Sequence, residues 1–169
     1  MLNRVAILTT GGTIEKTYNE SDGTLANVGS VLDYILRGLR HYDLDIRHIP
    51  VMSKDSLAMD DADRQTILYA VKAAMSQSDA VTIIHGTDTL VATGKYLQAN
   101  LSDVKKPIIL TGAMRPYEFR DTDAVQNVTE ALFATRLLNP GIWVVMHSRA
   151  LRFPGVIKDR SRMTFVQAD

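Results

Sequence analysis

The stretch RVAILTTGGT, residues 4–13, is an apolar run that ends in two threonines and a glycine pair. A short run rich in Val and Ile and bounded by a turn signal is typical of a buried β-strand. Segments of this kind predict strands at 4–10, 44–52, 80–86, 106–112 and 141–148. Helical spacing of apolar residues between them predicts helices near 28–41, 61–77, 89–100 and 121–138.

This alternation of strands and helices decides the fold class. Nearly continuous apolar strands separated by helices predict a mostly parallel sheet covered on both faces. We therefore expect a single three-layer α/β/α domain, flavodoxin-like or Rossmann-like, over residues 1–169. The pattern changes after residue 148, where RALRF (149–153) and MTFVQ (163–167) predict a C-terminal β-hairpin.

The composition narrows the class of protein. Lys plus Arg and Asp plus Glu both number 19 in the 169 residues, so no net charge favours nucleic acid or an anionic membrane. The absence of cysteine excludes disulfides, thiolate zinc sites and a cysteine nucleophile. No stretch approaches the length of a membrane-spanning helix, and we expect a cytoplasmic protein.

Polar loops follow the predicted strands, and ligands of open parallel sheets bind outside the carboxyl ends of the strands. The loops are TTGGT after the first strand, MSKDS after the second, HGTDT after the third and TGAMRP after the fourth. All four should lie at one edge of the sheet. Because turns and helix caps use the same residue types, a purely structural role for each single loop stays open.

Two other kinds of site fit the sequence poorly. Gly94-Lys95 is followed by Tyr96 and lacks the first glycine of a phosphate-binding loop, and the first loop lacks the dinucleotide pattern G-x-G-x-x-G. The four histidines are scattered without metal-binding spacing, so we expect no metal and no cofactor. His85, before Gly86, is expected to support the third loop by hydrogen bonding.

Hydroxyl chemistry is the remaining possibility. A threonine hydroxyl needs a nearby base to act as a nucleophile. HGTDT places Thr87 beside Asp88, and Lys158 is the one lysine of the C-terminal segment. Arginine stays protonated and cannot serve as the base, which leaves Lys158 as the candidate in that segment.

TTGGTIE, KDS, HGTDT and TGAMRP, in this order and spacing, resemble the N-terminal domain of the bacterial-type L-asparaginases. The resemblance covers essentially the whole chain. It implies that Thr13 is the nucleophile and forms an acyl-enzyme, and that Thr87 pairs with Lys158. It further implies that Asp88 holds the substrate's α-amino group and Ser56 its α-carboxylate.

The same resemblance implies further roles. Substrate contacts are expected at Gly12, Asp55, Gly86 and Ala113. Asp123 and Asn127 match a supporting stretch, and Tyr18 is the best match to the tyrosine of a mobile lid formed by KTYNESDGTLAN.

The predicted activity is hydrolysis of L-asparagine to L-aspartate and ammonia, with minor activity on glutamine. We expect a homo-oligomer, dimer or tetramer, without the family's second domain. The alternative is a non-catalytic module that binds an amino acid. A basic cluster in the tail is expected to be a solvated hairpin or a subunit contact rather than a nucleic-acid site; it comprises Arg149, Arg152, Lys158, Arg160 and Arg162.

Overall fold

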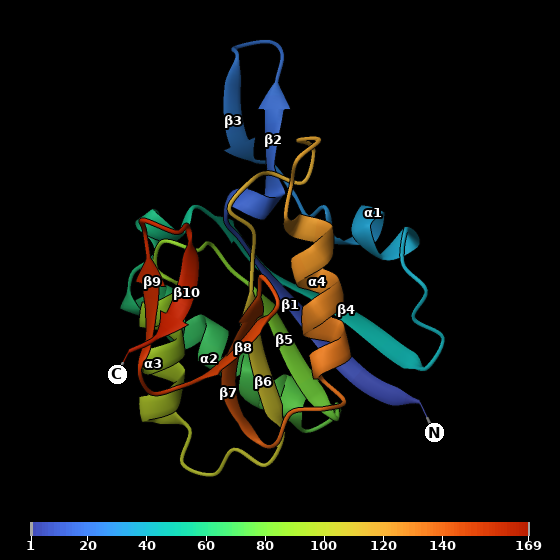
Figure 1. Cartoon of the computed structure of the whole chain (residues 1–169), viewed down its shortest axis with the longest axis vertical. Helices are drawn as coiled ribbons and strands as arrows, with labels where there is room; N and C mark the ends of the chain where they lie inside the picture. The colour runs from blue at the N-terminus through green and yellow to red at the C-terminus, as the bar shows by residue number, and fades with distance from the viewer. Residues whose placement is uncertain (1, 169) are drawn as a thin grey trace.

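The computed structural model describes residues 2–168, which contain a six-stranded sheet of order β4-β1-β5-β6-β7-β8 (Figure 1). Its strands are β1 (Asn3–Gly11), β4 (Leu44–Lys54), β5 (Ala80–Ile84), β6 (Pro107–Thr111), β7 (Gly141–Met146) and β8 (Arg149–Arg152). The first five pair in parallel, and β8 pairs antiparallel with β7. The predicted fold class is confirmed.

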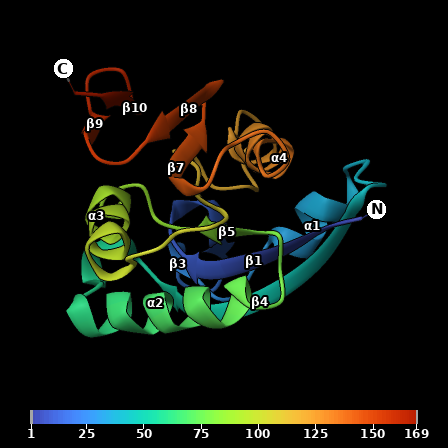
Figure 2. The same ribbon diagram turned by 90° about the horizontal axis from the view of Figure 1, so that it is seen from below.

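Helices cover both faces of the sheet (Figure 2). Helices α2 (Asp61–Met75) and α3 (Leu90–Asn100) pack on one face against side chains that include Ala6, Leu8 and Ile83. Helices α1 (Leu32–Arg37) and α4 (Ala124–Ala134) pack on the other face. Alternate residues of β1 therefore serve two cores, which is why the strand reads as a continuous apolar run.

Helix α2 begins at a capping box, because Asp60 accepts from Asp63 N at 2.9 Å and the Asp63 carboxylate accepts from Asp60 N at 3.1 Å. Two helices are shorter than predicted. The helix expected at 28–41 is restricted to α1, and the one expected at 121–138 is restricted to α4. Gly38 ends α1, since glycine is a poor helix former.

The segment predicted as a mobile lid forms a hairpin of β2 (Lys16–Asn19) and β3 (Thr24–Asn27), which projects from the body of the domain (Figure 1). The turn contains Asp22-Gly23, with Gly23 at a φ of 71°. Asp-Gly between short polar strands is a hairpin signal, and it identifies this element in retrospect.

The predicted C-terminal hairpin is present, but its first strand differs from the prediction. It consists of β9 (Val156–Asp159) and β10 (Thr164–Gln167). Residues 149–152 instead form β8 and extend the main sheet. Neither segment alternates strictly between polar and apolar residues, so the sequence pattern does not distinguish the two pairings.

The strand order creates a switch point. From β1 the chain goes to β4 on one side, and it then returns to β5 on the other side. In doubly wound sheets, the crevice at such a point, outside the carboxyl ends of the two strands, is where ligands bind. Here it lies between the loop that carries Thr13 and the loop that carries Thr87.

Candidate active site

The loop after β1 needs both of its glycines. Gly11 and Gly12 have φ values of 103° and 87°, which side chains rarely tolerate. A Cβ atom at Gly11 would overlap the backbone of Lys54, and one at Gly12 would overlap Gly86 Cα. The glycine pair therefore lets the loop turn sharply into a short 3₁₀ helix, Thr13–Glu15, and press against the loop after β5.

The loop after β5 holds three of the predicted residues together. Lys158 Nζ donates to Thr87 Oγ1 at 3.0 Å and to Asp88 Oδ1 at 2.8 Å. The Lys158 side chain is 10% exposed and the Asp88 side chain 30%. An amine this poorly exposed needs such partners, because burial of an unpaired polar group is costly.

Lys158 reaches this place on the C-terminal hairpin. In β9 it lies opposite Phe165 of β10. Val156 and Phe165 are fully buried in the core formed with α2 and α3. The apolar side chains thus anchor the hairpin, and the polar side chain of Lys158 lies over the end of β5.

His85 supports the same loop from beneath. Its ring is fully buried, with Nδ1 2.8 Å from Gly86 O and Nε2 2.8 Å from Thr93 Oγ1. Since a carbonyl only accepts, Nδ1 carries the proton and Nε2 accepts from the threonine hydroxyl. Burial lowers the pKa of His85 to about 4, so the ring is neutral. The supporting role expected from the sequence fits this geometry.

The loop after β4 completes the neighbourhood. Ser56 is 1% exposed, its Oγ accepts from Thr89 N at 3.3 Å, and a Cβ atom at Gly86 would lie 2.5 Å from it. Asp55 accepts from Lys16 Nζ at 2.6 Å, and this hydrogen bond lowers the pKa of the Asp55 carboxyl. The Lys16–Asp55 ion pair joins the start of β2 to the loop after β4.

Two of the predicted residues are less closely associated with the cluster. Tyr18 lies on β2 and is 60% exposed, and a Cβ atom at Gly23 would lie 3.8 Å from its hydroxyl, so its ring extends toward the turn of its own hairpin. Ala113 packs its methyl group into the core formed with α1 and α4, which leaves only its backbone for a ligand.

Asp123 and Asn127 support the loop after β6. Asp123 accepts from Met114 N at 3.0 Å and from Arg115 N at 3.1 Å, and Asn127 Nδ2 donates to Gly112 O at 2.9 Å. Burial opposes the charge on Asp123, but these backbone donors and His147 outweigh it and lower the pKa of Asp123. Gly112 of this loop lies near Thr87: a Cβ atom at position 112 would be 3.5 Å from the methyl group of Thr87.

The basic residues of the tail are divided among partners within the chain. Arg149 donates to Phe165 O at 3.2 Å, Arg152 donates to Pro140 O and stacks on the Trp143 ring, and Arg162 pairs with Asp159. Each of these three arginines therefore has a partner within residues 2–168.

Glu15 is a feature that the sequence analysis missed. Two residues after Thr13, it is 1% exposed, and burial raises its pKa to about 7. Its Oε1 atom has no hydrogen-bond partner within residues 2–168. Nothing in the pattern TTGGTIEK distinguishes a buried glutamate from an exposed one.

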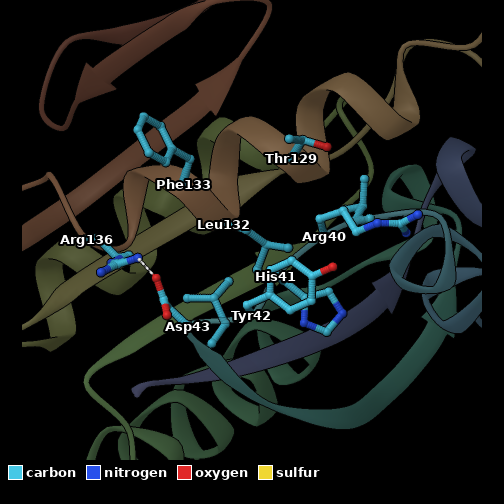
Figure 3. A pocket seen from close by; sticks show the side chains of 10 residues that line it. Arg40, His41, Tyr42, Asp43, Thr129, Leu132, Phe133 and Arg136 are labelled. Atoms are coloured by element: carbon cyan, nitrogen blue, oxygen red, sulfur yellow. Dashed lines mark hydrogen bonds and ion pairs between the residues drawn. The ribbon is translucent and has the colours of Figure 1, made fainter. Parts of the chain in front are cut away.

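One cavity lies away from these loops. It measures about 310 Å³ and is bounded by the loop before β4 and by α4, including Tyr42, Leu132 and Phe133 (Figure 3). Because it borders the amino end of β4, it lies at the opposite edge of the sheet from Thr87. Gly94 lies inside α3, where a Cβ atom would overlap the Phe153 ring, so packing accounts for the glycine.

Fold and site together define a doubly wound α/β domain with hydroxyl, carboxylate and amine groups at its switch point. The chain belongs to the asparaginase family: residues 4–165 match the family model "Asparaginase, N-terminal". It is 32% identical over 150 residues to the L-asparaginase of Thermococcus kodakarensis, covering 88% of this chain and 45% of that protein.

Further relatives agree with this assignment. The probable periplasmic L-asparaginase of Haemophilus influenzae is 26% identical over 163 residues, covering 93% of this chain and 46% of that protein. The solved structure of the thermostable L-asparaginase from Thermococcus kodakarensis superposes with a TM-score of 0.88 at 32% identity and covers 97% of this chain and 51% of that one. The chain therefore spans about half the length of the relatives it matches.

Proposed function

We propose that this domain hydrolyses the side-chain amide of L-asparagine to give L-aspartate and ammonia. The observation that carries the proposal is the contact of Lys158 Nζ with both Thr87 Oγ1 and Asp88 Oδ1 at the switch point. The close approach of Gly12 to Gly86 supports it, because this approach brings the loop of Thr13 to the loop of Thr87.

In the proposed reaction, Thr13 Oγ adds to the carboxamide carbon, and its proton passes to the leaving nitrogen. Ammonia departs and leaves an ester on Thr13, which water hydrolyses to L-aspartate and free Thr13. Thr87 and Lys158 serve as the proton-transfer pair, since a lysine in its uncharged form accepts a proton and then returns it. Backbone N–H groups near the glycine turn stabilise the oxyanion.

The α-groups of the substrate are assigned to Asp88 and Ser56. Lys158 and Arg160 both approach Oδ1 of Asp88, at 2.8 and 3.7 Å, so Oδ2 can accept from the substrate's ammonium group. Ser56 Oγ, beside Gly86, can donate to the α-carboxylate. Gly12, Asp55, Gly86 and Ala113 shape the backbone around the amino acid, and Tyr18 is assigned to the lid.

The test is release of ammonia from L-asparagine by the purified chain. Thr13→Ala and Thr87→Ala should abolish it, whereas Thr129→Ala, on the exposed face of α4, should leave it unchanged. L-glutamine should be a poorer substrate with measurable minor activity. One added methylene is discriminated by only about 1–3 kcal/mol, which lowers the activity without abolishing it. Absence of ammonia release from a well-folded sample would rule out the proposal.

The alternative is a module that binds the amino acid without hydrolysing it. Calorimetry that detects binding of L-aspartate or L-asparagine by a sample without turnover would favour that module. Analytical ultracentrifugation of the same sample tests the predicted homo-oligomer.

Among the helices of residues 2–168, none has the length and apolar character that a membrane span requires.

A further inference from the structure

The turn between β7 and β8 has an unusual backbone. His147 and Ser148 have φ values of 54° and 60°. Two-residue turns with both residues left-handed strongly favour Asn-Gly, and side chains in that conformation are strained. The turn is held to α4 by two backbone N–H groups: His147 N donates to Asn127 Oδ1 at 3.1 Å, and Ser148 N donates to Glu130 Oε2 at 2.9 Å.

The strained turn directs the His147 ring between two partners. Nε2 lies 2.7 Å from Asp123 Oδ2, and Nδ1 lies 2.9 Å from Thr164 Oγ1. A carboxylate only accepts, so Nε2 donates to Asp123. The neutral ring then accepts from the Thr164 hydroxyl at Nδ1, and a protonated ring would donate to the same oxygen after the hydroxyl rotates. Both hydrogen bonds are therefore compatible with either charge state of the ring.

The two partners of His147 belong to opposite sides of the candidate site. Asp123 holds the loop after β6, and Gly112 of this loop lies near Thr87, whose methyl group would be 3.5 Å from a Cβ atom at position 112. Thr164 begins β10, and its successor Phe165 lies directly opposite Lys158 in the β9–β10 ladder. His147 thus links the two sides: through Asp123 it contacts the loop after β6, near Thr87, and through Thr164 it contacts the hairpin that carries Lys158, whose amine donates to Thr87.

We propose that His147 is a positioning residue that fixes the β9–β10 hairpin relative to the loop after β6, and thereby holds the Lys158 amine at Thr87. Burial of Val156 and Phe165 keeps the hairpin on the domain, but apolar packing is non-directional. Directional contacts are needed to set where the hairpin lies, and His147 supplies one of them beside the hydrogen bond from Arg149 to Phe165 O. The role in catalysis rests on the proposed function, whereas the placement of Lys158 can be measured without it.

Three variants distinguish the contribution of the His147–Thr164 hydrogen bond from the contributions of the turn conformation and of side-chain packing. Thr164→Val preserves shape and strand preference but removes the hydroxyl, and Thr164→Ser restores it as the matched control. His147→Asn keeps a residue that tolerates the left-handed turn, but its shorter side chain cannot span Asp123 and Thr164. All three are made in the full chain, with circular dichroism to verify the fold.

The measurements are the NMR signal of the Lys158 side chain, assigned by its loss in Lys158→Arg, and amide exchange of residues 156–167. We expect Thr164→Val and His147→Asn to move the Lys158 signal toward that of free lysine. Both should also speed exchange in the hairpin about tenfold, the effect of losing one net hydrogen bond. Thr164→Ser should resemble the wild type. The double variant His147→Asn/Thr164→Val should show no faster hairpin exchange than either single variant, because both changes remove the same contact.

Unchanged Lys158 signals and hairpin exchange in both Thr164→Val and His147→Asn would overturn the proposal. If Thr164→Val does not fold, the comparison of His147→Asn with the wild type decides. Where ammonia release is present, the two variants should lower kcat about tenfold with little change in KM. If the wild type releases no ammonia, the proposed function fails, but the Lys158 signal still tests the placement.

Discussion

Lys158 Nζ lies 3.0 Å from Thr87 Oγ1, although 71 residues separate them in the chain. The contact joins the end of β5 to the C-terminal hairpin, two elements that do not pair in the same sheet. It is also the contact on which the proposed proton transfer depends.

Replacement of Lys158 should separate charge from proton transfer. Lys158→Arg keeps a cation for Asp88, but a guanidinium stays protonated and cannot accept a proton. We therefore expect Lys158→Arg and Lys158→Met each to lower the rate of ammonia release at least ~100-fold, the usual size of a general acid–base contribution. Lys105→Met, at an exposed lysine, is the control. Wild-type kcat in Lys158→Arg would show that only the charge matters.

Gly12→Ala should be strongly destabilising. The new methyl group would overlap Gly86 Cα, and a φ of 87° is strained for alanine. We expect a loss of more than about 1 kcal/mol in the free energy of unfolding. Gly29→Ala is the matched control, because its Cβ atom would meet nothing within 4 Å.

Urea denaturation of the two variants makes the comparison. Gly29→Ala should be neutral or more stable than the wild type by a few tenths of a kcal/mol, through the reduced entropy of its unfolded chain. Equal stability of Gly12→Ala and Gly29→Ala would mean that the two loops do not approach as closely as the structure shows.

The sequence was sufficient for the parts of the fold that depend on local pattern. The apolar runs located the strands, and the rule that ligands bind at the carboxyl ends of parallel strands brought the loops of Thr13 and Thr87 to one edge. It did not indicate that β1 and β5 are neighbours, since strand order depends on contacts between residues far apart in the chain.

The missed features have a common physical cause. Neither RALRF nor VIKD shows a strict alternation of polar and apolar residues, and the pairing of β8 with β7 depends on a turn at His147-Ser148 that lacks the usual Asn-Gly signal. The burial of Glu15 likewise depends on the residues that pack over it, not on its neighbours in the sequence. The pairing of β8 and the burial of Glu15 both depend on contacts that exist only in the folded chain.

Glu15 should make the protein less stable as pH rises. Its pKa is raised from 4.5 to about 7 by burial, so between these values the folded state binds a proton that the unfolded state has lost. The free energy of unfolding contributed by Glu15 therefore falls by about 1.4 kcal/mol for each pH unit in this window. Glu15→Gln, which cannot ionise, should remove this contribution, and Glu20→Gln in the exposed hairpin turn should not.

His85 should act in the opposite direction over nearly the same range. Burial lowers its pKa from 6.5 to about 4, so the unfolded state binds the extra proton and stability is lost as pH falls through this window. The two slopes have similar magnitude and opposite sign between pH 4.5 and 6.5. We expect the free energy of unfolding of the wild type to change little with pH in this window. That of Glu15→Gln should increase by about 1.4 kcal/mol for each unit of rising pH, because only the contribution of His85 remains. Urea denaturation at three pH values across the window measures both, and parallel curves for the two proteins would show that Glu15 titrates as an exposed carboxyl.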